Sequence, residues 1–401
     1  MKPKLLYLVH RIPYPPNKGD KIRSFHWLKG LSKDYEIYLG TFIDDENDWQ
    51  YINEVKKYCK DVYITGLNPA KAKLKSISGL TAGQALSLPY YKNKALQSWV
   101  DKTVDQNNIE KILVFSSSMA QFVEGPSFQN TRRIMDFVDI DSDKWQQYAE
   151  SKTGIMKWIY SREAIKLLNY EKHVNELFQA SLFVSSTEAD AFREMMNSSK
   201  QKVDYVNNGV DTEIFNPAFD LENPYDEQST TLVFTGAMDY WANVDAVVWF
   251  VNTHFPQIRS SNENVQFYIV GSNPSKEVLE LQKTDGVIVT GKVPSMLPYL
   301  RHADLAIAPM RIARGIQNKV LEAMAMEKVT LVSPQAYEGI HATPSKELIL
   351  IQDDDKWVDV VNKLLTKKSL EIGNTARCFV KRRYSWSANI QKLKQIINES
   401  K

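Results

Sequence analysis

The chain has 401 residues, 43% of them hydrophobic and 24% charged, so it is an ordinary globular protein that is long enough for two hydrophobic cores. Its 50 basic and 48 acidic side chains leave a net charge of +2, which gives no electrostatic basis for binding nucleic acid in bulk. It has no apolar run of about 18 residues that would span a bilayer, and Cys59 and Cys378 lack the spacing of a disulfide framework or a zinc site, so we expect a cytoplasmic protein.

Short apolar runs rich in β-branched residues alternate with amphipathic segments along the chain, a pattern typical of parallel α/β sheets. The first half supplies candidate strands at residues 4–10, 35–43, 61–67, 111–117, 132–140, 181–186 and 202–208. A second series lies at residues 230–237, 265–272, 286–291, 304–310, 329–334 and 347–352. The stretch between them is rich in Asn, Pro and acidic residues and has no periodicity. We therefore predict two Rossmann-like doubly wound domains, at residues 1–210 and 211–384.

The loop after the first strand, RIPYPPNKGDKIRSFHWL, is the first candidate site, because doubly wound sheets bind ligands at the carboxyl ends of their strands. Gly19 precedes a helix whose first turn contains Asp20 and Arg23. A structural turn explains the glycine almost as well as a ligand does. His10, which ends the strand, fits a packed histidine and a functional one equally.

The loop MDFVDIDSDKW follows a later strand and gathers carboxylates. Asp139 and Asp141 are placed to accept a proton from a reacting hydroxyl group. They also form a literal DxD triplet, which in another enzyme class holds a divalent ion. A third interpretation is an acidic turn that caps the helix beginning near Asp143.

In the second half, Gly236 follows a strand in FTGAMDYWANVDAV, where a small residue allows a phosphate to approach closely. A plain strand-to-helix turn capped by Asn243 or Asp245 is the alternative. Later, RIARGIQNKVLEAMAM follows the strand at residues 304–310. There the backbone N–H groups of Gly315, Ile316 and Gln317 precede a helix and favour an anion.

The same segment supplies side chains suited to a nucleotide. Arg311, Arg314 and Lys319 add positive charge for a diphosphate. Lys319 and Glu322 are three residues apart and share a helix face, which places Glu322 to accept hydrogen bonds from a vicinal diol such as ribose. A surface Lys/Glu pair would show the same spacing.

NKVLEAMAM, followed by a strand and SPQAYEGI, resembles the donor-site signature of GT-B glycosyltransferases of family 4, the glycosyltransferase group 1 family. HRIPYPPNKGDKIRSFHWLKGLS, DFVDIDSDKWQQYA, IYSREAIKLLNYEKHV, SLFVSSTEADAF and NNGVDTEIF resemble sugar transferases encoded with exosortase and exopolysaccharide gene clusters. The resemblance covers both halves of the chain.

The resemblance implies two Rossmann-like domains facing a cleft, with a C-terminal helix at residues 385–401 packed back on the first domain. It implies that Lys319 holds the donor diphosphate, that Glu322 holds the ribose, and that the loop of Gly19, Asp20 and Arg23 contacts the acceptor or a phosphate. It also implies retention of anomeric configuration. The two successive α/β series and the Arg/Lys site argue for metal-independent charge neutralisation, so we expect no metal cofactor. Arg314 stands where the family has a glutamate that contacts the donor sugar.

We therefore predict a cytoplasmic glycosyltransferase of the hexosyltransferase type, with Asp139 or Asp141 as the base. Its partners would be a nucleotide-sugar donor and a saccharide or lipid-linked saccharide acceptor in polysaccharide or glycoconjugate assembly, and not nucleic acid. A peripheral membrane contact through residues 71–75, or through Trp158 and Tyr160, competes with a solvated charge run. The alternatives are a non-catalytic sugar-binding protein, a metal-dependent DxD transferase and a nucleotide-sugar epimerase of GT-B architecture.

Overall fold

The computed structural model describes residues 2–16, 19–150, 153–197, 199, 202–313, 315–366 and 370–399. The chain forms two compact units. Unit 1 comprises Met1–Asn208 and Asn389–Lys401, and unit 2 comprises Gly209–Ala388. The last long helix, α18 (Trp386–Asn398), therefore begins in unit 2 and continues in unit 1.

Unit 1 is built on a parallel seven-stranded sheet in the order β3-β2-β1-β4-β5-β6-β7. The order reverses between β1 and β4, which is the switch point where doubly wound sheets bind ligands. The strands are β1 (Lys4–Val9), β2 (Glu36–Ile43), β3 (Asp61–Gly66), β4 (Lys111–Phe115), β5 (Arg132–Val138), β6 (Ala180–Phe183) and β7 (Val203–Tyr205).

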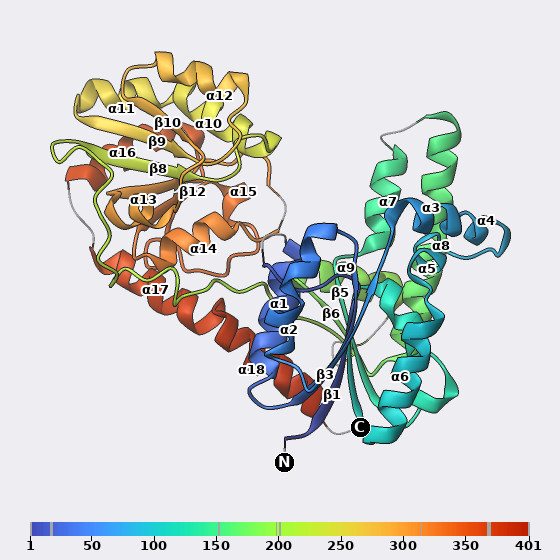
Figure 1. Cartoon of the computed structure of the whole chain (residues 1–401). Helices are drawn as coiled ribbons and strands as arrows, with labels where there is room; N and C mark the ends of the chain where they lie inside the picture. The colour runs from blue at the N-terminus through green and yellow to red at the C-terminus, as the bar shows by residue number, and fades with distance from the viewer. Residues whose placement is uncertain are drawn as a thin grey trace. The chain divides into compact units, whose positions relative to one another are not determined.

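Helices cover both faces of this sheet, with α1 and α18 on one side and α6 on the other (Figure 1). Tyr35 donates a hydrogen bond of 2.9 Å to Asn398, and Arg132 donates one of 2.8 Å to the carbonyl of Ile396, which ties α18 to the edge of the sheet. The helices are α1 (Gly19–Leu31), α2 (Ile52–Lys56), α3 (Pro69–Ser76), α4 (Ser78–Thr81), α5 (Ser87–Tyr91), α6 (Lys94–Asn107), α7 (Asp141–Glu150), α8 (Gly154–Leu177) and α9 (Ser186–Met196).

Unit 2 has a parallel six-stranded sheet in the order β10-β9-β8-β11-β12-β13. Its strands are β8 (Thr230–Thr235), β9 (Val265–Val270), β10 (Val287–Gly291), β11 (Leu305–Ala308), β12 (Val329–Val332) and β13 (Ile349–Leu350). Its helices are α10 (Trp241–Thr253), α11 (Phe255–Ser261), α12 (Lys276–Glu280), α13 (Leu297–His302), α14 (Asn318–Ala325), α15 (Pro334–Tyr337), α16 (Trp357–Thr366) and α17 (Leu370–Arg383). Helices α10 and α11 lie on one face of the sheet, and α13 and α14 on the other (Figure 1).

Strand burial explains the sequence pattern. Leu5, Leu6, Tyr7 and Leu8 of β1 are all buried, because helices cover both faces of a parallel sheet and no side of the strand meets water. Each predicted strand overlaps a strand of the structure, which confirms the predicted α/β class with two doubly wound sheets. None of the described helices has both the length and the apolar character needed to cross a bilayer.

Candidate active site

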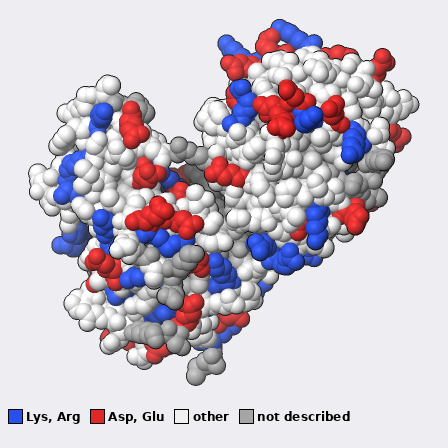
Figure 2. Space-filling model, turned by 180° about the vertical axis from the view of Figure 1, so that it is seen from behind, with Lys and Arg blue, Asp and Glu red and all other residues white. Residues whose placement is uncertain are grey.

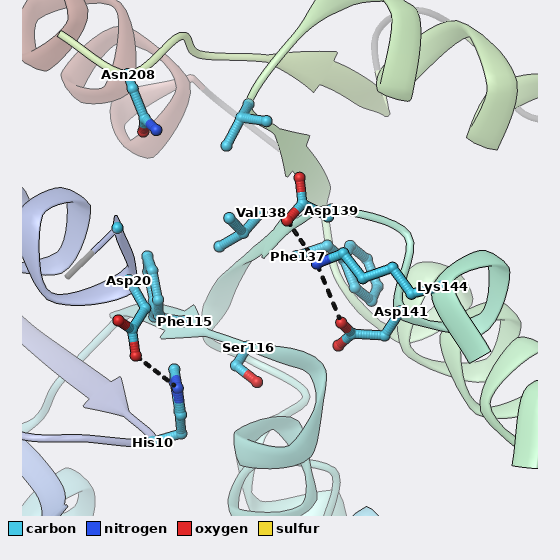
Figure 3. A pocket seen from close by; sticks show the side chains of 12 residues that line it. His10, Asp20, Phe115, Ser116, Phe137, Val138, Asp139, Asp141, Lys144 and Asn208 are labelled. Atoms are coloured by element: carbon cyan, nitrogen blue, oxygen red, sulfur yellow. Dashed lines mark hydrogen bonds and ion pairs between the residues drawn. The ribbon is translucent and has the colours of Figure 1, made fainter. Parts of the chain in front are cut away.

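Unit 1 contains a pocket of about 330 Å³ at the carboxyl edge of its sheet (Figure 3). His10 follows β1, Phe115 ends β4 and Val138 ends β5, so three strands around the switch point open into the same space. The lining residues are His10, Gly19, Asp20, Phe115, Ser116, Phe137, Val138, Asp139, Asp141, Lys144, Val184 and Asn208.

The backbone is strained at two points of this lining. Val138 has a φ of 74° and Ser116 a φ of 76°, which are left-handed values that a β-branched residue in particular avoids. Both positions are fixed by hydrogen bonds, since Ser116 N–H donates to the carbonyl of Asp136 and the carbonyl of Val138 accepts from Val184. Strain of this kind concentrates at functional sites, which favours a ligand in this pocket.

Asp139 and Asp141 face the same ammonium group. Nζ of Lys144 lies 2.6 Å from Oδ2 of Asp139 and 3.9 Å from Oδ1 of Asp141 (Figure 3). Burial raises the pKa of Asp141, although the charge of Lys144 opposes that shift. Asp139 is thus held in a close ion pair, and Asp141 is the carboxylate better suited to accept a proton.

Glu171 of α8 binds Ser142, the residue after Asp141, and it was not among the site residues predicted from the sequence. It is fully buried and accepts hydrogen bonds from the backbone N–H and the hydroxyl of Ser142, at 3.1 and 2.5 Å. Burial raises its pKa to about 8. The carboxyl group of Glu171 therefore fixes the first turn of α7, which begins at Asp141. Glu171 itself lies in the amphipathic helix α8, and nothing in the local sequence indicates this role.

His10 and Asp20 form a second polar pair in the pocket (Figure 3). Oδ2 of Asp20 lies 3.4 Å from Nε2 of His10 and 2.8 Å from Nη1 of Arg11. Burial opposes ionisation of Asp20, but the hydrogen bond from His10 and the charge of Arg11 hold its pKa well below the usual range. Nδ1 of His10 is buried and has no hydrogen-bond partner among the described residues, so its hydrogen-bonding capacity is unused.

Arg23 has a structural role instead of the predicted contact with acceptor or phosphate. Its guanidinium group is fully buried and pairs with Asp136, with Nε 2.8 Å from Oδ2. It also donates to the carbonyl of Val206 and to Asn208, so these contacts already use Nε and both terminal nitrogens. Gly19 and Asp20 of the same predicted loop do line the pocket.

In unit 2 the loop after β8 meets the start of α14. Nζ of Lys319 donates a 2.5 Å hydrogen bond to Oδ1 of Asn243 and lies 4.2 Å from the centroid of the Phe234 ring. A Cβ atom on Gly236 would lie 2.7 Å from Nδ2 of Asn243 and 3.3 Å from Nζ of Lys319, so only glycine leaves this space open. Gly236 and Lys319, more than 80 residues apart in the chain, thus share one site at the carboxyl edge of the sheet.

The electrostatics of this site come from two partly buried side chains. Burial lowers the pKa of Lys319 to about 7, against the opposing charge of Glu322. Burial likewise raises the pKa of Glu322 to about 7, and the charge of Lys319 opposes that shift. An ammonium group in such surroundings gains from a bound anion, because the anion restores the favourable interactions that burial removes.

The other predicted donor residues lie in the segment before α14. Arg311 is exposed and pairs with Asp245 of α10, which is its principal contact. Gly315 has a φ of 64°, so the backbone turns there in a left-handed conformation that suits glycine, and Ile316 packs on the core. Arg314 lies outside the described residues. Within the described ranges, no group of three or more His, Cys, Asp or Glu side chains is arranged to hold a metal ion.

These two units have the architecture of a GT-B glycosyltransferase, and solved structures of that class agree over the whole chain. A glycosyltransferase from Rickettsia africae has a TM-score of 0.63 at 13% identity and covers 100% of both chains. The Anabaena protein Alr3699/HepE, solved in complex with UDP, has a TM-score of 0.63 at 13% identity over 98% of each chain. At these identities the likeness establishes the fold.

Residues 229–367 match the family model "Glycosyl transferases group 1", which confirms the predicted resemblance to the glycosyltransferase group 1 family over this segment of unit 2. An uncharacterized 44.6 kDa protein in the cps region of Klebsiella pneumoniae is 19% identical over 366 residues, which are 88% of each chain. The matched segment contains Gly236, Lys319 and Glu322, and it supports a glycosyltransferase.

Proposed function

We propose that this protein transfers a sugar from a nucleoside diphosphate sugar to a hydroxyl acceptor, as a glycosyltransferase of the hexosyltransferase type. The observation that carries the proposal is the convergence of Lys319, Asn243 and Gly236 within a glycosyl transferases group 1 domain. A partly desolvated ammonium group beside a glycine with no room for a Cβ is suited to a diphosphate. Glu322, one turn further along α14, would accept hydrogen bonds from the ribose hydroxyl groups.

The donor side of the reaction needs a stabilised leaving group. The bond between the anomeric carbon and the diphosphate oxygen breaks, and the nucleoside diphosphate leaves with the electron pair. Lys319 would neutralise that charge from a fixed position. The Anabaena protein was also solved with UDP and glucose and with UDP-glucose, which makes UDP the first nucleotide to test.

We assign the acceptor to the pocket of unit 1. Its hydroxyl oxygen forms the new bond to the anomeric carbon, and its proton passes to Asp141, whose raised pKa suits that step. The resemblance to transferases of exopolysaccharide clusters supports a saccharide or lipid-linked saccharide acceptor. We propose retention of configuration on the same basis, which requires the acceptor hydroxyl to reach the anomeric carbon from the face that the diphosphate leaves.

We propose that this transfer requires no metal ion. The DxD triplet at Asp139 and Asp141 already has an ammonium counter-ion, since Lys144 lies 2.6 Å from the first carboxylate and 3.9 Å from the second. A divalent ion bound there would be repelled by that ammonium group.

The test is a thermal-shift panel of UDP, GDP, ADP, TDP and CDP in EDTA. One nucleotide at about 100 times its Kd should stabilise the wild type by about 2.7 kcal/mol, a shift of several degrees. Lys319→Gln and Glu322→Ala should lose this shift, and Lys276→Gln, an exposed lysine of α12, should keep it. No shift with any nucleotide, or one that needs Mn²⁺ or Mg²⁺, would contradict the proposed donor site.

Product analysis then separates transfer from the alternatives. Incubation with the matching nucleotide sugar should consume donor faster when an acceptor saccharide is added. A changed nucleotide sugar formed without acceptor would identify an epimerase, and nucleotide-sugar binding without turnover under any condition would identify a binding protein.

A further inference from the structure

One stretch of unit 1 carries lysines but no acidic residues. Residues 62–100 contain no Asp or Glu, in a chain whose 50 basic and 48 acidic side chains otherwise balance. Blue and red side chains are mixed over most of the surface that Figure 2 shows. The acid-free stretch carries Lys71, Lys73, Lys75, Lys92 and Lys94.

A second acid-free segment begins α8, and the two segments lie side by side. Residues 153–162 include Lys157 and Arg162 but no acidic residue. Nη2 of Arg162 donates a 2.8 Å hydrogen bond to the carbonyl of Gly79, and the carboxylate of the next residue, Glu163, accepts from Leu86 N–H at 2.7 Å. We call residues 69–81 and 154–166 together the α3–α8 face, which belongs to unit 1 alone.

Large apolar side chains protrude from this face. Leu74 is 72% exposed and Ile77 55% exposed at the end of α3, and on α8 Ile155 is 73%, Trp158 59% and Ile165 59% exposed. At 100° per residue the three α8 side chains fall within a sector of about 80°, so they form one stripe of the helix. Single exposed apolar residues are ordinary, but five of this size on two adjoining segments mark an interaction surface.

The charge identifies the partner. Lysines around exposed Trp, Ile and Leu side chains complement a surface that is anionic at its boundary and apolar just beneath it, which describes the headgroup region of a bilayer with acidic lipids. Tryptophan is enriched at that boundary. In support, burial and the neighbouring charge of Lys92 lower the pKa of Lys75, and an anionic surface would favour the charged form of this lysine.

We propose that the α3–α8 face binds the surface of an anionic lipid bilayer. The apolar stripe of α8 enters the headgroup region, and the lysines of α3 contact the acidic headgroups. Such contact would bring a lipid-linked acceptor to the protein. The binding itself needs no donor, acceptor or turnover.

The experiment is co-sedimentation of the purified full chain with vesicles of phosphatidylcholine alone or mixed with phosphatidylglycerol. Wild type should bind the mixed vesicles much more strongly, and added salt should weaken the binding. Ile155→Ser with Trp158→Ser, and separately Lys71→Gln with Lys73→Gln and Lys75→Gln, should each weaken it by at least about tenfold. Lys276→Gln with Leu279→Ser on α12, a matched exposed pair in unit 2, should leave it unchanged.

Three results would overturn the proposal: no binding to the mixed vesicles, equal binding to both kinds, or equal loss in the α12 variant. A wild type that self-associates in light scattering, and that the Trp158→Ser change makes monomeric without any vesicle binding, would assign the face to a second copy instead. The nucleotide panel run on the same preparations keeps the two proposals apart, because it reports on unit 2. Thermal unfolding of each variant checks that these exposed changes leave the fold intact.

Discussion

Nζ of Lys319 lies 2.5 Å from Oδ1 of Asn243, and a Cβ atom on Gly236 would lie 3.3 Å from that same nitrogen. Three segments of unit 2 thus meet at one ammonium group: the end of β8, the start of α10 and the start of α14. Because parallel strands end at the same edge of a sheet, residues distant in the chain are neighbours there.

Gly236→Ala should weaken nucleotide binding by about tenfold or more. The new methyl group would lie 2.7 Å from Nδ2 of Asn243, closer than any real contact, so the asparagine and the lysine it positions must move. Isothermal titration in EDTA measures the effect. Gly125→Ala is the matched control, since its Cβ would meet only ordinary contacts at 3.7 Å or more. Equal nucleotide affinity in the wild type and in Gly236→Ala would contradict the proposed close approach of the diphosphate to Gly236.

Nucleotide affinity should fall as the pH rises above about 7. The free site holds Lys319 with a pKa of about 7, and a bound diphosphate raises that pKa, so binding takes up a proton over the range between the two values. Nucleotide affinity is therefore highest below pH 7, and it falls by up to about tenfold per pH unit above pH 7. Lys319→Arg stays charged and should flatten the profile between pH 7 and 9. Glu322→Gln removes the other group of this site with a pKa of about 7, and a profile that is flat in both wild type and Glu322→Gln would show that Lys319 is not the titrating group.

Asp141→Asn should lower kcat by roughly 10²- to 10⁴-fold while nucleotide affinity stays the same, because the proton acceptor is lost and the donor site is in the other unit. Asp139→Asn should cost less, since that carboxylate is held in the ion pair with Lys144. Steady-state kinetics with saturating donor measure both. Asp143→Asn, in the same turn of α7, is the control, and a larger loss in Asp139→Asn than in Asp141→Asn would reverse our assignment.

Glu171→Gln should change the pH dependence of stability. The pKa of Glu171 is about 8 in the folded chain and near 4.5 when unfolded, so the folded state holds an extra proton between these values. The contribution of Glu171 to the free energy of unfolding is therefore complete below about pH 4.5 and is lost as the pH rises to 8. The amide of Glu171→Gln does not ionise, so the variant does not show this loss. The Tm of the variant should exceed that of wild type at pH 8 but not at pH 5. Identical slopes in both proteins would mean that Glu171 is ionised when folded.

Arg23→Met should destabilise unit 1 by about 3–5 kcal/mol, because it leaves the fully buried carboxylate of Asp136 without its ion-pair partner. Denaturant unfolding followed by circular dichroism measures the change. Lys57→Met, which removes one half of the exposed pair with Glu54, should have little effect. A stable Arg23→Met variant with a raised KM for acceptor would instead restore the ligand role predicted from the sequence.

The two pairs Arg23–Asp136 and Lys319–Asn243 show how far sequence reasoning reaches. Lys319 was predicted at a donor site from local patterns, namely helical spacing and a glycine at position 315, and its donor role stays a prediction. Arg23 has an equally suggestive local pattern, yet its side chain is buried in an ion pair with Asp136, which is 113 residues away in the chain. Glu171 was missed for the same reason, since only the packing of α8 against α7 places it under Ser142.

The amino-acid sequence by itself determined the α/β class, the two series of strands and the loops that follow them, because hydrophobic periodicity is a local property that burial on both faces of a parallel sheet imposes. Only the tertiary structure decided which charged residues are open to a ligand and which are buried partners, and which carboxylate of the DxD triplet is held by Lys144. Those outcomes depend on distances between segments far apart in the chain and on how much water the fold removes from each group, and neither quantity is written in any short stretch of residues.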